Sequence, residues 1–287
     1  MKILVTGSGG QLGSEIQELA SEFPELQFDF TDYPELDITN ASLVSDLFKQ
    51  NKYDYCINCA AYTAVDKAET EREASDRINL TGSLNLAKAC KPYDVTLIHI
   101  STDFVFNGGG STPLKETHLT DPVNYYGVSK LKGERAIQNT LKKHFIFRTS
   151  WLYSSHGENF VKTMLRLSQT RDELNIIADQ IGTPTYARDL ARAILLIISR
   201  KSTSYGLYHY SNEGVASWYD FTKAIFEYRK VNTKVNPIPT EKYPTPAKRP
   251  HYSVMDKSKF RETFEIEIPY WRESLKACLE DQSVFLG

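Results

Sequence analysis

The sequence predicts an α/β fold built as a doubly wound parallel sheet, and three observations predict it. Short apolar runs alternate with helical patterns over residues 1–150, the first run ends in a glycine-rich turn, and polar residues follow a later run. Parallel strands need crossover connections, which helices supply. Ligands of such sheets bind at the carboxyl ends of the strands. We therefore expect the chemistry of this protein at that edge.

The individual elements of the first half follow from their apolar spacing. Strands are predicted, in chain order, at residues 2–6, 26–32, 53–59, 95–100 and 145–149. Leu12, Ile16 and Leu19 recur at the helical period, and this first helix ends at Pro24. Further helices are predicted at residues 42–50, 76–90 and 125–139. The alternation is the one expected of consecutive βαβ units.

The second half of the chain, from about residue 150, is less regular. Helical patterns are present at residues 160–167, 187–199, 218–229 and 270–279. Prolines cluster between the last two, so residues 235–251 are predicted to be an extended loop. We expect a smaller C-terminal lobe that covers the active edge of the sheet. Residues 1–150 then form the nucleotide-binding domain and residues 151–287 mostly the second lobe, with some segments returning to the sheet.

Composition and charge exclude several classes of protein. The chain has 34 basic and 36 acidic residues and a formal net charge of −2, whereas nucleic-acid binding usually leaves a basic excess. No apolar run approaches the ~18–20 residues that span a bilayer, and the first apolar run is too short for a signal peptide. Cys56 and Cys59 form a C-x-x-C pair, which can signal zinc or redox chemistry, but no second pair or nearby histidine completes a site, so buried structural thiols are expected; the six histidines are scattered without metal-ligand spacing. We expect a soluble, cytoplasmic protein without nucleic-acid or membrane partners and without a metal site built on these residues.

The turn after the first strand contains Gly7, Gly10 and Gly13, in the spacing G-x-x-G-x-x-G. Glycines allow a sharp turn, let backbone N–H groups approach a pyrophosphate, and let the following helix pack close to the strand. Such a turn can also simply join a strand to a helix. Asp32 ends the second strand, where a carboxylate binds an adenosine ribose or is merely solvated. No Arg or Lys lies within several residues of Asp32, which favours NADH without excluding NADPH.

Two further groups of polar residues suggest proton transfer. Tyr126 and Lys130 are four residues apart in a predicted helix and share one face, where a cation lowers the pKa of a phenol. The alternative is a solvated helix face. Ser101, Thr102 and Asp103 follow the fourth strand, where a hydroxyl can bind a substrate carbonyl. Alternatively, Ser101 or Asp103 only bonds to the backbone of a turn.

Longer motifs carry a resemblance that covers nearly the whole chain. They are Asn58-Cys-Ala-Ala-Tyr-Thr-Ala-Val-Asp, Ser101-Thr-Asp-Phe-Val-Phe, Tyr126-Gly-Val-Ser-Lys, Arg148-Thr-Ser-Trp151, Asn159-Phe-Val-Lys-Thr-Met-Leu, Asp179-Gln-Ile-Gly-Thr-Pro-Thr and Tyr243-Pro-Thr-Pro-Ala-Lys-Arg-Pro. With the glycine turn, these motifs resemble the extended short-chain dehydrogenase/reductases and, within them, the dTDP-4-dehydrorhamnose reductase family. The resemblance implies a Rossmann-type fold and an enzyme of dTDP-rhamnose synthesis. Its reaction is reduction of the C4 keto group of dTDP-4-dehydro-β-L-rhamnose with NADH or NADPH.

The resemblance also implies roles for individual residues. The residues implied in cofactor binding are Gly10, Gln11 and Leu12 at the pyrophosphate, Asp32 at the adenosine ribose, Asp37 and Ile38 near the adenine, and Ala60, Ala61, Tyr62 and Thr63 along the cofactor's path. The catalytic trio is Thr102, Tyr126 and Lys130, of which Tyr126 and Lys130 also belong to the implied cofactor site, and the residues contacting the dTDP-sugar are Thr102, Asp103 and Trp151. Two features depart from the family: an additional glycine, Gly9, expected to change little, and a compressed stretch between Asp32 and Asp37 that contains Pro34.

Two alternative functions stay open at this point. One is another nucleotide-sugar reductase, epimerase or dehydratase of the same superfamily. Many dehydratases carry an Asp-Glu pair where this chain has Asp103 and Phe104, which disfavours a dehydratase. The other is a non-catalytic regulator, because the regulatory subunit of methionine adenosyltransferase resembles the same family. The intact catalytic trio favours an enzyme.

The resemblance leaves a metal and the oligomeric state open. Some family members hold magnesium through glutamates at a dimer interface, and Glu15 matches one such position. One glutamate does not define a site, so Mg²⁺ and a homodimer are both left undecided. Lys248 and Arg249 lie in the proline-rich segment, where they either meet the nucleotide diphosphate or are solvated.

Overall fold

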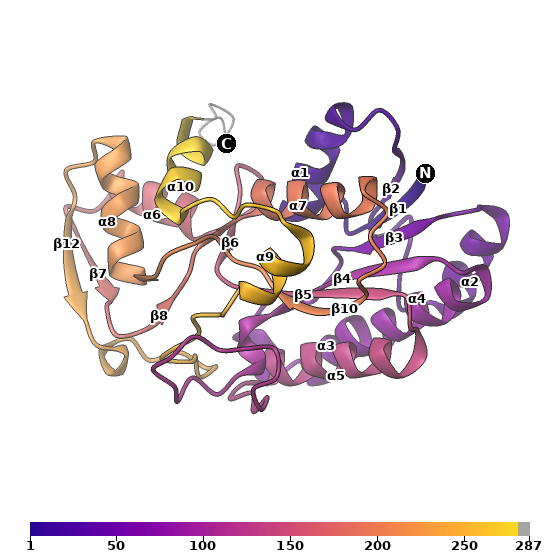
Figure 1. The fold of residues 1–287 in the computed structure, drawn as a ribbon. Helices are drawn as coiled ribbons and strands as arrows, with labels where there is room; N and C mark the ends of the chain where they lie inside the picture. Colours follow the sequence, from indigo (N-terminus) through magenta and orange to yellow (C-terminus); the bar gives the residue numbers. More distant parts are fainter. Residues whose placement is uncertain (281–287) are drawn as a thin grey trace.

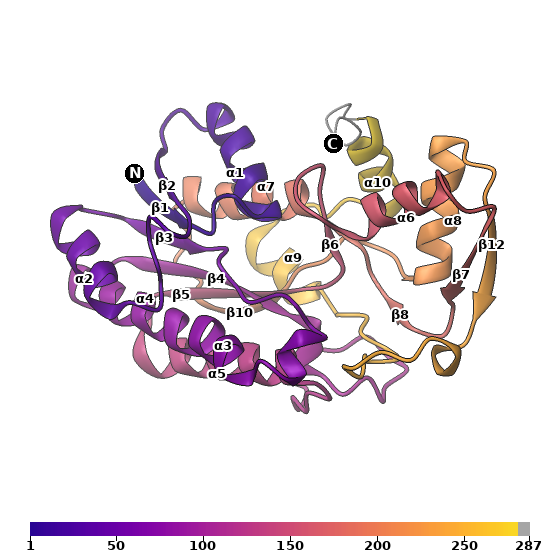
Figure 2. The same cartoon turned by 180° about the vertical axis from the view of Figure 1, so that it is seen from behind.

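The computed structural model describes residues 1–280, in which a six-stranded parallel sheet lies beside a smaller group of helices and strands (Figures 1 and 2). The strands of the sheet are β1 (Lys2–Thr6), β2 (Gln27–Thr31), β3 (Tyr55–Asn58), β4 (Thr96–Thr102), β5 (His144–Thr149) and β10 (Gly206–His209). Their spatial order is β10-β5-β4-β3-β1-β2, and every neighbouring pair is parallel. The predicted doubly wound α/β fold is confirmed.

Helices cover both faces of this sheet, as Figure 1 shows. One face packs against α1 (Gln11–Leu19), α7 (Ala187–Ser199) and α9 (Ser258–Phe264), and the other against α2 (Ala41–Gln50), α4 (Ser83–Cys90) and α5 (Tyr125–Thr140). Ile3 and Val5 belong to the core on the first face and Leu4 to the core on the second. Strands buried on both faces consist of continuous apolar runs, which is why these strands could be predicted from the sequence.

The predicted helix at residues 76–90 is interrupted by a π-helical turn. It starts as α3 (Arg72–Asp76), continues as the π turn (Arg77–Gly82) and ends as α4. Within the turn, Asn79 accepts a hydrogen bond from the Tyr62 N–H and donates one to the Ser129 hydroxyl on α5. The turn therefore fixes the loop after β3 against α5. Such turns are frequent at functional sites.

The second group of elements has its own apolar core. It contains α6 (Phe160–Ser168), α8 (Trp218–Arg229) and α10 (Trp271–Glu280), packed against the strand pair β7 (Glu173–Ile177) and β12 (Lys234–Ile238). Two further short strand pairs contribute Tyr153, Tyr186 and Ala216 to this core. They are β6 (Leu152–Tyr153) with β9 (Thr185–Tyr186), and β8 (Ile181–Gly182) with β11 (Ala216–Ser217).

The structure corrects the sequence-based expectation in two places. Residues 235–238 of the predicted loop lie in β12, whose Pro237 is tolerated because β12 pairs only with β7 and is an edge strand. The strand β10 was not predicted, although it completes one edge of the main sheet beside β5. No helix within residues 1–280 is long and apolar enough to cross a membrane.

Candidate active site

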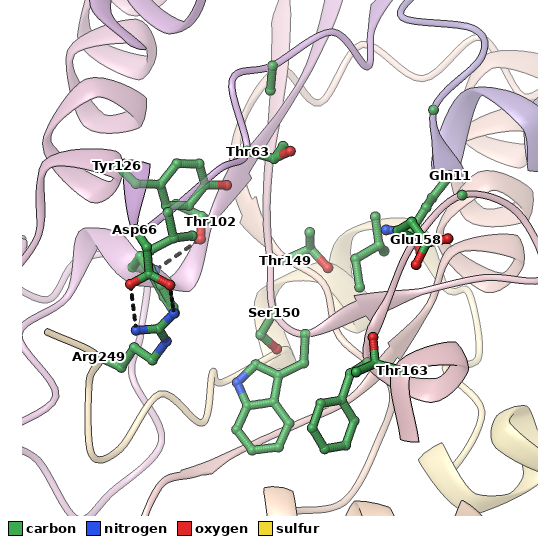
Figure 3. Close-up of a pocket in the computed structure, with 18 of the residues that line it drawn as sticks. Gln11, Thr63, Asp66, Thr102, Tyr126, Thr149, Ser150, Glu158, Thr163 and Arg249 are labelled. Atoms are coloured by element: carbon green, nitrogen blue, oxygen red, sulfur yellow. Dashed lines mark hydrogen bonds and ion pairs between the residues drawn. The ribbon is translucent and has the colours of Figure 1, made fainter. Parts of the chain in front are cut away.

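A cavity of about 1460 Å³ lies at the carboxyl ends of β1, β3, β4 and β5, between the sheet and the second group of elements (Figure 3). It brings together fifteen of the predicted site residues: Gly7, Gly10, Gln11, Leu12, Asp32, Asp37, Ile38, Ala60, Ala61, Thr63, Thr102, Asp103, Tyr126, Lys130 and Trp151. Gly13 and Tyr62 do not line it. The Tyr62 hydroxyl instead donates to Glu71, 2.7 Å away.

The glycine turn at one end of the cavity has the geometry that a pyrophosphate requires. Gly7 has a φ of +68°, and a Cβ there would lie 2.5 Å from the Ala60 backbone nitrogen. Gly10 is the N-cap of α1, and no side chain in the described structure caps this helix start. The first backbone N–H groups of α1 are therefore available to an anion at the cavity wall. Gly13 has a different role, because a Cβ there would lie 2.5 Å from the Gly7 carbonyl oxygen.

Asp32 lies at the end of β2 and fixes the glycine turn. Its Oδ2 accepts a hydrogen bond of 2.8 Å from the Gly9 N–H, and its Oδ1 accepts one of 2.8 Å from the Tyr33 N–H. A Cβ on Gly9 would lie 2.7 Å from Asp32 Oδ2. The small size of Gly9 lets the carboxylate approach the turn, and the expectation that this additional glycine changes little stays a prediction. Each carboxylate oxygen still has a lone pair for a ribose hydroxyl.

Tyr126, Lys130 and Thr102 converge on the edge of the sheet beside β4. Tyr126 and Thr102 lie on the same side of the cavity in Figure 3, opposite Gln11. The Lys130 ammonium donates a 2.7 Å hydrogen bond to the Ile100 carbonyl, and burial lowers the pKa of Lys130 to about 8. Burial raises the pKa of Tyr126 to about 12, opposed by a hydrogen bond with Thr102 and increased by Asp103. The predicted lowering of the Tyr126 pKa was wrong, since desolvation outweighs the hydrogen bond with Thr102 and the Asp103 charge adds to the rise.

Asp103 is buried beside this trio. The Thr102 hydroxyl donates to its Oδ1 at 3.1 Å, and Thr102 also accepts from the Phe104 N–H. Burial raises the pKa of Asp103 to about 6, while hydrogen bonds with Ser253 and Thr102 oppose the rise. Asp103 therefore changes charge close to neutrality.

A buried ion pair that the sequence did not reveal lies behind the trio. Glu134 follows Lys130 by one helical turn on α5, and it accepts two hydrogen bonds from Arg148, of 2.9 and 2.7 Å. The Ser101 hydroxyl donates to the same carboxylate at 2.5 Å. Glu134 and Arg148 are only 1% and 3% exposed. This network ties the ends of β4 and β5 to α5, and Glu134 partly offsets the lowering of the Lys130 pKa.

The other end of the cavity is lined by aromatic rings and by basic side chains, among them Arg249. Trp151 stacks on Trp218, with ring centroids 3.6 Å apart, and Phe160 packs against Trp218. Arg249 forms a bidentate ion pair with Asp66, drawn in Figure 3, and both residues line the cavity. Of the basic pair in the proline-rich segment, only Arg249 reaches the cavity, because Lys248 is exposed and does not line it.

In the described part of the chain, one group of side chains has the spacing of a metal site: Glu15, Glu18 and His156. Arg188 pairs with both carboxylates, and His156 hydrogen-bonds to Glu18. Burial raises the pKa of Glu15, with smaller opposing contributions from Ser154 and Arg188. Arg188 therefore balances one of the two carboxylate charges of this group.

The fold and the site together define an NAD(P)H-dependent oxidoreductase with a Rossmann-type sheet, and comparisons with known proteins identify the family. A family model described as "RmlD substrate binding domain" matches residues 1–284. The chain is 42% identical over 294 residues to the dTDP-4-dehydrorhamnose reductase of Escherichia coli K12, with 98% of each chain covered. The chain therefore belongs to the RmlD family, and the resemblance to dTDP-4-dehydrorhamnose reductases is confirmed.

Two solved structures agree with this assignment, each with a TM-score of 0.94. One is a dTDP-4-dehydrorhamnose reductase of Clostridium acetobutylicum, 43% identical, and the other is a dTDP-4-dehydrorhamnose reductase of Bacillus anthracis in complex with NADP, 40% identical. In both comparisons 98% of this chain and 99% of the other chain are covered.

Proposed function

We propose that this protein reduces the C4 ketone of dTDP-4-dehydro-β-L-rhamnose to the alcohol of dTDP-L-rhamnose, with either NADPH or NADH. The observation that carries the proposal is the position of Tyr126, Lys130 and Thr102 in the same cavity as the glycine turn. In this assignment residues 1–150 mainly hold the cofactor and residues 151–287 mainly hold the sugar nucleotide. We place the enzyme in the cytoplasm, where nucleotide sugars are made.

The reduction needs one hydride and one proton. The bound cofactor supplies the hydride to C4, and its nicotinamide is oxidised in the same step. Tyr126 is protonated at neutral pH because its pKa lies near 12, so its hydroxyl donates the proton to the developing O4 alkoxide. Thr102 holds the same oxygen, and the Lys130 cation stabilises the phenolate that remains. The buried position of Lys130 strengthens that attraction.

The substrate side of the cavity has groups suited to a sugar diphosphate. Asp103 accepts a hydrogen bond from a sugar hydroxyl, and the Trp151 ring forms an apolar wall for the sugar. Arg249 uses two of its five N–H groups on Asp66 and one on the Ala247 carbonyl, which leaves two for a phosphate oxygen.

Asp32→Ala tests the choice between the two cofactors. Residues 32–39 contain no Lys or Arg to pair with a 2′-phosphate, whereas the Asp32 carboxylate suits a ribose hydroxyl. Loss of one hydrogen bond to a charged group costs about tenfold in affinity. We expect kcat/KM for NADH to fall about tenfold and the NADPH-to-NADH ratio to rise. Glu35→Ala, an exposed carboxylate outside the cavity, is the control. An unchanged ratio in Asp32→Ala contradicts the assignment.

The pH dependence of kcat/KM is expected to be bell-shaped. Asp103 must be ionised to accept from a sugar hydroxyl, so activity falls as the pH drops through about 6. Lys130 must be cationic to stabilise the phenolate, so activity also falls as the pH rises through about 8. Both pKa values are those of the free enzyme, and the pH dependence of kcat/KM reports the pKa values of the free enzyme. Asp103→Asn removes the acidic limb; an acidic limb that persists in this variant rules out Asp103 as its origin.

The proposal is tested by following absorbance at 340 nm with purified protein, NADPH or NADH, and enzymatically generated dTDP-4-dehydrorhamnose. We expect one cofactor oxidised for each sugar nucleotide, and none when the sugar nucleotide is left out. An epimerase would retain and recycle its nicotinamide, and a regulatory subunit would oxidise none. Either of these two results overturns the proposal.

A further inference from the structure

Trp151 is held in a backbone conformation that a bulky side chain rarely adopts. Its φ is +47°, in the left-handed region where residues other than Gly, Asn and Asp are uncommon. Such a conformation persists only where the surroundings determine it, and it is concentrated at functional sites. Trp151 also lines the sugar end of the cavity. The contacts that hold its ring therefore bear on how the sugar is placed.

Contacts from two distant parts of the chain hold this ring. The indole of Trp218 lies against the indole of Trp151 at a centroid distance of 3.6 Å and an interplanar angle of 9°. Gly182 of β8 packs against the Trp151 ring so closely that a Cβ there would lie 2.7 Å from Cε2 and 2.9 Å from Nε1. The position of the Trp151 ring is thus set by stacking on Trp218 and by the absence of a Cβ at Gly182, which lets the ring lie against the β8 backbone.

Trp218 is itself fixed. Its Nε1–H donates to Gln180 Oε1 at 3.2 Å, and Phe160 packs against its ring with a centroid distance of 4.5 Å. Gln180 in turn donates to the Thr240 hydroxyl, which belongs to the segment after β12. Trp218 begins α8, directly after the capping box formed by Ser217. The Trp151 ring is therefore supported by a chain of contacts that runs through the second group of elements.

We propose that Trp218 and Gly182 are positioning residues for the reduction, which hold the Trp151 indole where it forms the wall of the sugar subsite. This inference rests on the proposed function, because it assumes that Trp151 contacts the sugar nucleotide. Trp218 also lines the cavity, but its ring packs against Trp151 and Phe160, so it acts through Trp151 and not by its own contact with the sugar. Its loss therefore weakens binding of the sugar nucleotide and leaves the cofactor site and the proton donor unchanged.

A double-mutant cycle tests this dependence. Trp218→Leu is expected to raise KM for the sugar nucleotide by about 2- to 12-fold, the range of one aromatic pair, with Kd for NADPH unchanged. In a Trp151→Ala background the same substitution is expected to change KM less than about twofold, because the ring it supports is gone. An equal rise of KM in both backgrounds would show that Trp218 contacts the sugar directly. That result, or no rise in the single variant, overturns the proposal.

Gly182→Ala provides a second variant that does not alter Trp218. Its new Cβ must displace the Trp151 ring, so we expect a rise in KM for the sugar nucleotide with unchanged NADPH binding. Two stacked indoles also give an exciton couplet in circular dichroism, which Gly182→Ala should alter and Trp218→Leu should abolish. An unchanged KM in Gly182→Ala together with an altered couplet contradicts the positioning role.

Trp271→Phe is the matched control. Trp271 is buried in the core of α8 and α10 and does not line the cavity, so its substitution should leave both KM and the couplet unchanged. The proposed function is tested separately, with the wild-type protein. If the wild type does not oxidise NADPH with the sugar nucleotide, the proposed function fails, whereas the couplet still reports whether the stack exists.

Discussion

Tyr126→Phe is expected to lower kcat by about 10²–10⁴-fold, the range for loss of a positioned proton donor. The variant keeps the ring, which packs edge-on against Phe104 with centroids 5.8 Å apart, and loses only the hydroxyl beside Thr102. The developing O4 alkoxide would then have to take its proton from water. Steady-state kinetics with saturating sugar nucleotide measure the fall, and fluorescence titration with NADPH should show unchanged cofactor binding.

Tyr125→Phe is the control for this experiment, since it removes a hydroxyl from the neighbouring residue. The Tyr125 hydroxyl donates to Asp76 and accepts from Lys132, and Tyr125 does not line the cavity. Its kcat should stay close to that of the wild type. If Tyr126→Phe keeps near-normal kcat, or if both variants lose the same activity, Tyr126 is not the proton donor.

Glu134→Ala is expected to reduce the free energy of unfolding by about 3–5 kcal/mol, the usual cost of removing one partner from a buried ion pair. Arg148 would remain 3% exposed with its carboxylate partner gone, and the Ser101 hydroxyl would lose its acceptor. The loss would also loosen the contact between α5 and the end of β4, where the catalytic trio lies.

Urea unfolding followed by circular dichroism measures this loss of stability. Asp46→Ala removes one partner of an exposed pair with Lys49 and is expected to cost less than about 1 kcal/mol. A cost below about 1 kcal/mol for Glu134→Ala as well would mean that the Arg148 guanidinium finds another partner or water. The network would then not be the structural support described above.

The main sheet could be predicted because its strands show their burial directly in the sequence. Ile3, Leu4 and Val5 form a continuous apolar run, which is typical of a strand covered on both faces. The strand β10 could not be predicted in the same way. Its four residues, Gly206–His209, become a strand only because the edge of β5 is free to pair with them. The strand β5 is distant in sequence from residues 206–209, so the local spacing of apolar residues does not indicate this pairing.

The parts of the candidate site that depend on the spacing of neighbouring residues in the sequence could be predicted. Tyr126 and Lys130 share a helix face because they are four residues apart, and the glycine turn is contiguous. The pairing of Glu134 with Arg148 depends on how α5 packs against the sheet, and the pairing of Arg249 with Asp66 depends on the return of the proline-rich segment to the cavity. The high pKa of Tyr126 likewise follows from burial, which only the folded chain defines.

The central claim is that a nicotinamide hydride reaches C4 of the sugar while Tyr126 protonates O4. The most direct measurement uses NADPH carrying deuterium at the transferred position of the nicotinamide, with NMR analysis of the sugar nucleotide formed. The account predicts deuterium at C4 of dTDP-L-rhamnose, one atom for each cofactor oxidised. Product without deuterium at C4, or cofactor oxidised without a change in the sugar, would contradict it.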